Sequence, residues 1–106
     1  MIATDISNYT VVGEIPLSKN PNQSFQIVLD GQNCTINVYQ KDDTVYVDLF
    51  VDTLPVFYGL SALDRVGIKL SEYMNFKGHL WFEDQNGTQN PDYTGFGERY
   101  LFYYGK

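Results

Sequence analysis

The feature that most constrains the fold is an alternation of apolar and polar side chains between residues 25 and 60. Because successive side chains of an extended chain point to opposite faces, a period of two gives each set its own face of a sheet. Asp30-Gly31 and Lys41-Asp42-Asp43 separate the runs, and Asp-Gly in this position is a strong hairpin signal. We therefore predict an antiparallel meander. Its main apolar face comprises Phe25, Ile27, Leu29, Cys34, Ile36, Val38, Val45, Val47, Leu49 and Val51.

Shorter segments on both sides continue the strand pattern. Residues 10–17 are predicted to form a strand that lies at an edge or ends near Pro16, because proline cannot donate to a β-ladder. Further strands are expected at 56–60, 66–70 and 78–83. The strand predicted at 98–104 is apolar on both faces, as is typical of a central or covered strand. Polar loops are expected at 18–24 and 88–97, and single helical turns at 61–64 and 71–75.

Together these elements predict an all-β fold. We expect one small antiparallel β-barrel or sandwich of about 7–8 short strands, with at most one-turn helices. A chain of 106 residues is long enough for one domain with its own core. We place that domain at residues 10–106, after a polar N-terminal segment at residues 1–9.

Charge and hydropathy argue against two classes of partner, nucleic acids and membranes. The chain carries 7 basic and 13 acidic residues, and the basic residues are scattered, so no cluster would follow a phosphate backbone. No run approaches the roughly 18 apolar residues of a membrane-spanning helix. The N-terminus lacks the basic flank and apolar stretch of a signal peptide, and the single cysteine favours a reducing compartment. We expect neither nucleic-acid nor membrane binding.

Nucleophiles and bases are few and isolated in the sequence. His79 lies in a predicted strand with no second histidine or cysteine nearby. Cys34 belongs to an apolar face, where burial raises the pKa of a thiol and leaves it unreactive. The carboxylates of Asp42-Asp43 and of Glu83-Asp84 are adjacent, so they diverge rather than converge on one bond as a glycosidase pair does. We predict that the chain is not an enzyme.

The acidic turn at residues 83–87 is the best place for a metal ion. An EF-hand loop needs oxygen ligands at its first, third and fifth positions before the glycine. Counting back from Gly87 places Phe82 at the first position, so that pattern fails. A looser calcium site through Asp84 and Asp92 is the remaining alternative. We predict no cofactor and no metal.

The C-terminal third contains the motifs of a known family. A Gly-His-Leu-Trp-Phe strand at 78–82 precedes an Asp-Gln-Asn-Gly turn at 84–87, an Asn-Pro-Asp-Tyr-Thr-Gly-Phe-Gly loop at 90–97 and an Arg-Tyr-Leu strand at 99–101. Upstream, Ile15-Pro16-Leu17 and the segments 20–25 and 29–34 match the family's usual opening. Over about residues 14–105 the chain resembles the baseplate plug family of contractile-tailed bacteriophages, the myophage and cyanophage type of central plug. Phe96 stands where that family usually has an aliphatic residue.

The resemblance implies a structural virion protein, made in the bacterial cytoplasm, at the centre of the phage tail baseplate. It implies packing in several copies against hub, spike or tail-tube proteins, with no cofactor and no catalytic residue. The alternative is a small β-fold module that binds a carbohydrate or a peptide. A surface Trp81 among the 9 tyrosines would suit that alternative.

The candidate interface residues are Tyr93, Phe96, Arg99 and Tyr100. Tyr93 and Phe96 lie in a loop constrained by proline and glycine, and aromatic residues are enriched at interface centres. In the alternative, Tyr93 folds back over the end of the barrel and Phe96 plugs it. Arg99 can anchor a carboxylate of a partner through two hydrogen bonds. We favour the alternative in which it pairs with Glu83 or Asp84 across the hairpin.

Overall fold

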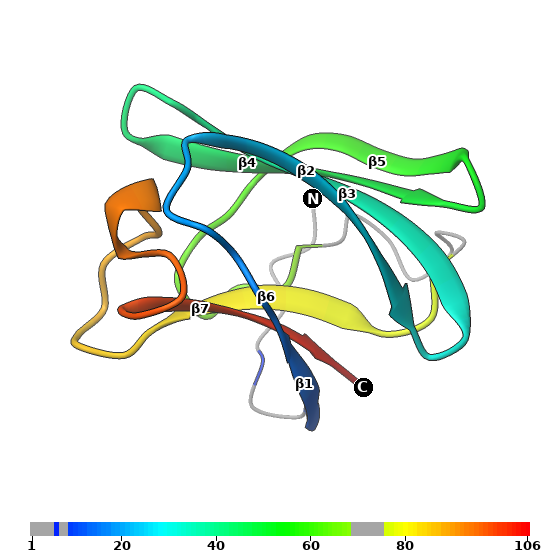
Figure 1. Ribbon diagram of the computed structural model, residues 1–106. Helices are drawn as coiled ribbons and strands as arrows, with labels where there is room; N and C mark the ends of the chain where they lie inside the picture. Colours follow the sequence, from blue (N-terminus) through cyan, green and yellow to red (C-terminus); the bar gives the residue numbers. More distant parts are fainter. Residues whose placement is uncertain (1–5, 7–8, 69–75) are drawn as a thin grey trace.

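The computed structural model describes residues 6, 9–68 and 76–106, and these form two antiparallel sheets packed face to face (Figure 1). One sheet has the order β2-β3-β4-β5 and the other the order β1-β7-β6. The sheets do not close on each other, so the all-β prediction is confirmed in its sandwich form. The elements are β1 (Val11–Ile15), β2 (Asn22–Leu29), β3 (Gln32–Lys41), β4 (Thr44–Val51), β5 (Leu54–Ser61), β6 (His79–Asp84), the short 3-10 helix η2 (Tyr93–Gly95) and β7 (Tyr100–Gly105).

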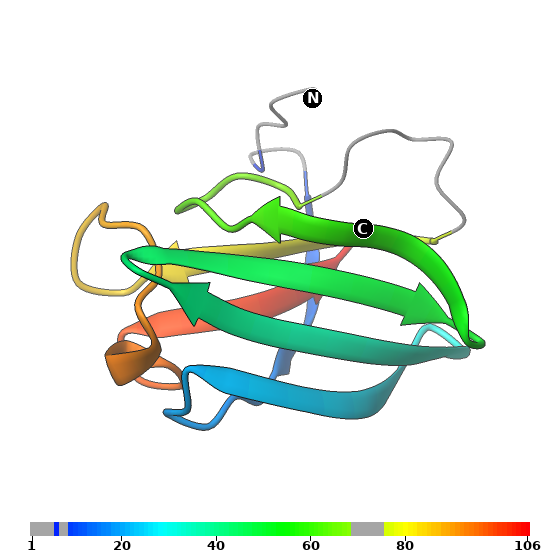
Figure 2. The same ribbon diagram turned by 90° about the horizontal axis from the view of Figure 1, so that it is seen from above.

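The four-stranded sheet is the predicted meander, and its strands follow one another in sequence (Figure 2). Asp30 and Gly31 both have positive φ, at 52° and 75°, as do Asp52 and Thr53, at 51° and 70°. Two consecutive residues in this conformation give a turn whose twist matches that of the flanking strands. β2 begins at Asn22, so the loop predicted at 18–24 is three residues too long. The extra residues pair with β3, Asn22 opposite Tyr39.

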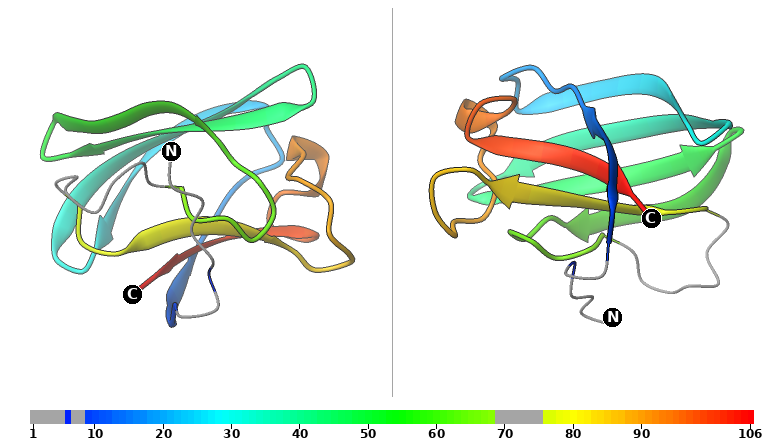
Figure 3. Two further views of the ribbon diagram at one scale, coloured as in Figure 1. Left: turned by 180° about the vertical axis from the view of Figure 1, so that it is seen from behind. Right: turned by 90° about the horizontal axis from the view of Figure 1, so that it is seen from below.

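The three-stranded sheet brings together strands from both ends of the described chain (Figure 3). β7 is its central strand, with β1 on one side and β6 on the other. A central or covered position was predicted for this strand because residues 98–104 are apolar on both faces. The position of β7 between β1 and β6 confirms that prediction. β1 is an edge strand that ends at Ile15, immediately before Pro16, which is also as predicted.

The core lies between the two sheets. All of the predicted inward residues of β3 and β4 are buried, with Ile36, Val38, Val45, Val47 and Leu49 at 0% exposure. From the other sheet, Phe82 and Phe102 stack with ring centroids 4.4 Å apart, and Phe96 adds a third ring 5.8 Å from Phe82.

Two of the predicted short elements are wrong. Ser61 is the last residue of β5, opposite Tyr46, and does not begin a helical turn at 61–64. The Asp64 carboxylate accepts a hydrogen bond from Asp84 N at 2.7 Å. It therefore binds the end of β6 and does not stabilise the predicted helical turn. Residues 66–68 are not a strand of either sheet, although Ile68 N donates to Leu80 O along β6 at 2.7 Å. Residues 69–70, and the helical turn predicted at 71–75, lie outside the described residues.

The predicted C-terminal strand also begins later than expected. Glu98 and Arg99 form a turn, because the backbone N–H groups of both donate to Gly95 O, at 3.2 and 2.9 Å. β7 therefore starts at Tyr100. The turn directs the side chain of Arg99 back toward Asp84, at the end of β6.

Candidate partner interface

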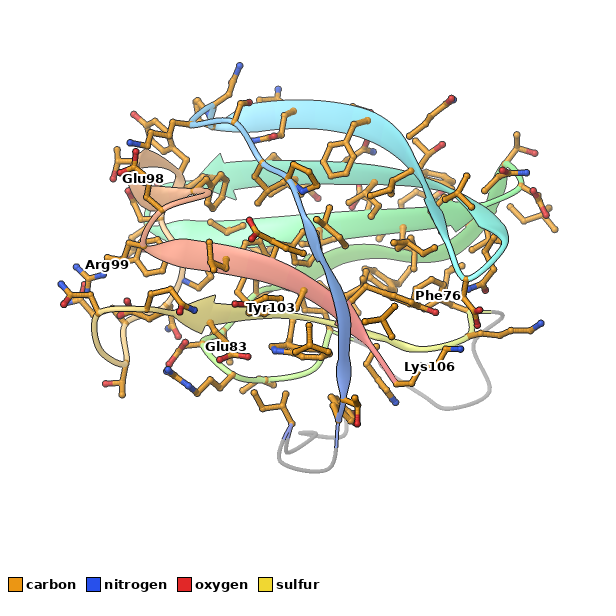
Figure 4. The ribbon with its side chains drawn as sticks, turned by 60° about the horizontal axis from the view of Figure 1, so that its bottom comes forward. Phe76, Glu83, Glu98, Arg99, Tyr103 and Lys106 are labelled. Carbon is orange, nitrogen blue, oxygen red and sulfur yellow. The ribbon has the colours of Figure 1, made fainter. Side chains whose placement is uncertain are left out.

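Three of the interface candidates, Tyr93, Phe96 and Arg99, lie in the connection between β6 and β7, and the fourth, Tyr100, is the first residue of β7, all at one end of the sandwich. Figure 1 shows this connection, in orange, near the turn between β3 and β4. The labelled side chains of Glu98 and Arg99 project at this end in Figure 4, while Phe76 and Lys106 lie at the other. A loop of this length acquires a defined shape only if its polar groups have partners, so those partners decide what the site can do.

Asp84, the last residue of β6, is the anchor of the loop. Its side chain is fully buried and accepts hydrogen bonds from Arg99 Nε at 2.9 Å and Arg99 Nη2 at 3.0 Å. The backbone N–H groups of Asn86 and Gln89 also donate to it, at 2.9 and 2.8 Å. The Arg99 hydrogen bonds hold the pKa of Asp84 well below its usual range, and the two backbone donors act in the same direction. The predicted pairing of Arg99 across the hairpin is thus confirmed, with Asp84 as its partner.

A second arginine, which the sequence analysis did not single out, holds the other side of the loop. Arg65 Nη2 donates to Asp84 O at 3.0 Å and Arg65 Nη1 to Gly87 O at 3.1 Å. The same Nη1 forms an ion pair with Asp64 at 2.6 Å. No periodic pattern joins residues 64–65 to a loop some twenty positions away, so the sequence carried no signal of this contact.

Gln40, near the end of β3, ties the loop to the four-stranded sheet. Its Oε1 accepts from Tyr93 N at 2.9 Å, and its Nε2 donates to Asp92 Oδ1 at 2.8 Å. Asp92 is the N-cap of η2 and accepts hydrogen bonds from the backbone N–H of Thr94, at 3.1 Å, and from the Thr94 hydroxyl. Its pKa is lowered, first by the Thr94 hydroxyl and then by Gln40. η2 is therefore fixed to the four-stranded sheet.

The four candidates divide into two buried and two partly exposed residues. Phe96 and Tyr100 are 2% and 5% exposed and belong to the core. Phe96 therefore closes the end of the core, as the alternative interpretation held. Tyr93 is half-buried against the core, and the Arg99 side chain is 33% exposed. Tyr93 and Arg99 remain candidates for contact with a partner, whereas Phe96 and Tyr100 present little surface for it.

An open depression of about 600 Å³ lies beside these residues. The described residues that line it include the carboxylates of Asp43, Asp92 and Glu98, and Arg99 is the one cation among them. The described lining is therefore net acidic. Such a surface favours a partner that offers cations or hydrogen-bond donors and disfavours another anionic surface.

The oxygens proposed for a looser calcium site already have partners. Both oxygens of Asp84 bind Arg99, and both oxygens of Asp92 bind protein donors. Within the described residues, no three His, Cys, Asp or Glu side chains gather as a metal-ion site. The same part of the chain contains no helix long and apolar enough to cross a membrane.

The remaining sequence candidates are explained by packing. Cys34 is buried, and its burial raises the pKa of the thiol, as predicted. His79 stacks on Tyr9 with ring centroids 3.8 Å apart.

Trp81 is 1% exposed and lies on the face of β6 away from the main core, where Tyr9 and Tyr103 pack on it. Its predicted surface position, which supported the carbohydrate- or peptide-binding alternative, is therefore wrong.

The chain matches the model of a known protein family. Residues 12–106 match the model of the family described as cyanophage baseplate Pam3 plug gp18. The matched range contains β2 to β7, almost all of β1 and the whole of the loop described above. No curated protein matches the chain.

Proposed function

Because this chain belongs to the cyanophage baseplate plug family, and is thus a structural protein of the virion tail baseplate, we propose that it packs there in several copies against hub, spike or tail-tube proteins. The proposed contact is the acidic end of the sandwich, around the depression beside Tyr93 and Arg99. The role is structural and not catalytic. We propose that residues 10–106 act in it as one domain.

The observation that supports this surface most directly is the rigidity of the loop that forms it. Hydrogen bonds of Arg99 within the loop, of Arg65 in the segment before β6 and of Gln40 in β3 hold the loop before any partner binds. A surface that is ordered in advance loses little conformational entropy on docking, so more of the contact energy appears as affinity. Loops held on a rigid scaffold are also where binding residues concentrate.

The charge of the chain fits a place near a channel through which DNA passes. The net charge is −6, and the basic residues are scattered along the sequence. An acidic surface repels the phosphate backbone, so a protein that lines or closes such a channel would not retain the DNA. This supports the proposal together with the family membership.

Co-expression of the tagged chain with the hub, spike and tail-tube proteins of its own phage tests the proposal. We compare Glu98→Lys, at the depression, with Glu14→Lys, which makes the same charge change on β1. Within the described part of the chain, Glu98 forms an ion pair with Lys19 on the surface, at 2.7 Å, and such exposed pairs contribute little stability. We expect Glu98→Lys to reduce recovery of the partner on the order of tenfold, because like charges then face each other.

The control fixes how the result is interpreted. Glu14→Lys should recover the partner as the unchanged chain does. Equal recovery by both variants would show that the acidic end is not the contact. Failure of the unchanged chain to recover any of the three proteins would contradict the proposed packing itself.

A further inference from the structure

The two edges of the four-stranded sheet differ in how they are protected from further pairing. β5 contains Pro55, two shifts of register against β4 and Gly59 with a φ of 60°. Prolines and bulges are common devices that prevent another strand from adding to an edge. β2 has none of these, because its eight residues pair with β3 in an unbroken register and include no proline and no charged residue. Figure 2 shows β2 as the outermost strand of this sheet.

The backbone groups of β2 that point away from β3 can be identified from its register. Gln40 N donates to Pro21 O at 2.8 Å, so the hydrogen-bonded pairs with β3 fall at odd-numbered residues of β2. The N–H and C=O groups of Ser24, Gln26 and Val28 therefore point away from β3. Asn22 differs, since its N–H donates to Asn20 Oδ1 at 3.1 Å.

We propose that this edge pairs with β2 of a second copy of the chain, antiparallel, about a two-fold axis at Gln26. Gln26 then faces Gln26, and Ser24 of each copy faces Val28 of the other. Each of these opposed residues exchanges two backbone hydrogen bonds, so the pairing uses these three positions and needs no other. The two meanders become one continuous sheet with β2 of both copies at its centre.

The side chains of β2 are compatible with this register. A two-residue period keeps even-numbered residues on the outer face and odd-numbered residues on the inner face in both copies. Phe25 therefore lies opposite Ile27 of the second copy, and both are only partly buried against the core of one copy. An aromatic residue opposite a β-branched one is a favourable cross-strand pair. Val28, which is 63% exposed in the single chain, gains cover from the same contact.

Electrostatics favours this edge over the acidic end of the sandwich as the place where a second copy binds. Two chains of net charge −6 repel each other. The acidic depression would add to that repulsion, whereas β2 brings only uncharged side chains into contact. This inference is independent of the contacts proposed with other baseplate proteins, because it concerns a different surface and needs no other protein.

The test is the molar mass of the purified full chain in solution, measured by sedimentation over a range of concentrations. Gln26→Lys places two like charges opposite each other at the proposed axis, on an exposed position that leaves the fold of one copy unchanged. Leu54→Lys is the matched control, because it adds the same charge at 61% exposure on β5, the other edge of the sheet. We expect a concentration-dependent dimer for the unchanged chain and for Leu54→Lys, and a monomer for Gln26→Lys.

A second measurement fixes the register. Residues directly opposite in a hydrogen-bonded pair have Cα atoms about 5.5 Å apart, which is within the range that a disulfide spans. Gln26→Cys should therefore form a covalent dimer on mild oxidation, while Leu54→Cys should not, and buried Cys34 takes no part. A monomeric unchanged chain, a Gln26→Lys dimer, or cross-linking through Leu54→Cys alone would each overturn the proposal.

Discussion

Arg99 meets Asp84 through two parallel hydrogen bonds, Nε to Oδ1 at 2.9 Å and Nη2 to Oδ2 at 3.0 Å. A bidentate pair of this kind fixes the orientation of both groups as well as neutralising their charges. Because the same carboxylate accepts from Asn86 N and Gln89 N, one ion pair determines the course of the loop next to it. The shape of the proposed partner surface thus depends on a contact beneath it.

Replacing Arg99 should destabilise the fold more than breaking an exposed ion pair does. Arg99→Ala leaves the buried carboxylate of Asp84 without its counter-charge, which is costly. Arg99→Lys restores a charge but not the two parallel bonds, so its Tm should lie between those of the alanine variant and the unchanged chain. Lys19→Ala, which breaks the exposed pair with Glu98, is the control. Thermal melts should show a several-fold larger Tm decrease for Arg99→Ala than for Lys19→Ala, and equal decreases would contradict this account.

Acidification should remove the contribution of Asp84 to stability. Its pKa in the folded chain is below the unfolded value of about 3.9. The stabilisation is therefore complete above about pH 4 and is lost as the pH falls toward the folded pKa. Asp84→Asn should be less stable at pH 7 and show a weaker loss of stability below pH 4. Denaturant titrations across this range measure both effects, and parallel pH profiles for the two chains would be evidence against the assignment.

Gly95 should not tolerate a methyl group, although its φ lies outside the left-handed region. A Cβ at this position would lie 2.7 Å from Cδ2 and 2.8 Å from Cε2 of the buried Tyr100 ring. Gly95→Ala should reduce the free energy of unfolding by about 1–3 kcal/mol, which is the usual cost of overpacking. Gly13→Ala on β1 meets nothing within 4 Å and should be neutral or stabilising by up to about 1 kcal/mol. Chemical denaturation of both variants compares them directly.

Removing the amide of Gln40 should loosen η2 without unfolding the sheets. Gln40→Ala deletes the acceptor of the Tyr93 N–H and one donor to Asp92. We expect faster hydrogen exchange at Tyr93 and Thr94, with unchanged protection in β3 and β4. Gln32→Ala is the control, because its side chain bonds to Lys77 near the other end of the sandwich. Equal exchange at Tyr93 in both variants would show that Gln40 is not what holds η2.

The parts of the fold that could be predicted from sequence are those with local causes. The alternation in residues 25–51 specified the strands, and short turns such as Asp30-Gly31 determined which strands are neighbours. Residues 61–68 were misassigned because their conformation depends on distant backbone partners. Residues 61 and 62 pair with β4, and residues 64–68 form hydrogen bonds to β6, which lies 12 to 20 positions away. The alternation of one strand also cannot reveal what covers its second face, so Trp81 was expected at the surface.

The structural parts of the candidate site were predicted more fully than its role. Residues 88–97 form a loop, as predicted, and Arg99 pairs with a carboxylate across the hairpin, as predicted, whereas contact of this loop with a partner stays a prediction. Gln40 and Arg65 were not predicted as parts of the site, because neither belongs to a motif. Each forms hydrogen bonds to a loop that is remote in sequence. Which of two neighbouring aromatic residues points inward depends on the packing of both sheets, which a single loop sequence does not encode.

The unequal connectivity of the two sheets has a consequence for the order of folding. β2 to β5 are joined by turns of a few residues. β1 and β7 are neighbours in their sheet but are separated by most of the chain in sequence, so their pairing closes a long loop. Closing that long loop costs more entropy than closing the hairpins, so we expect the meander to assemble first and β7 to dock late. The loop before β7 then reaches its final form in the last step. A neighbour that recognises this loop would select finished molecules and leave partly folded chains out of the assembling particle.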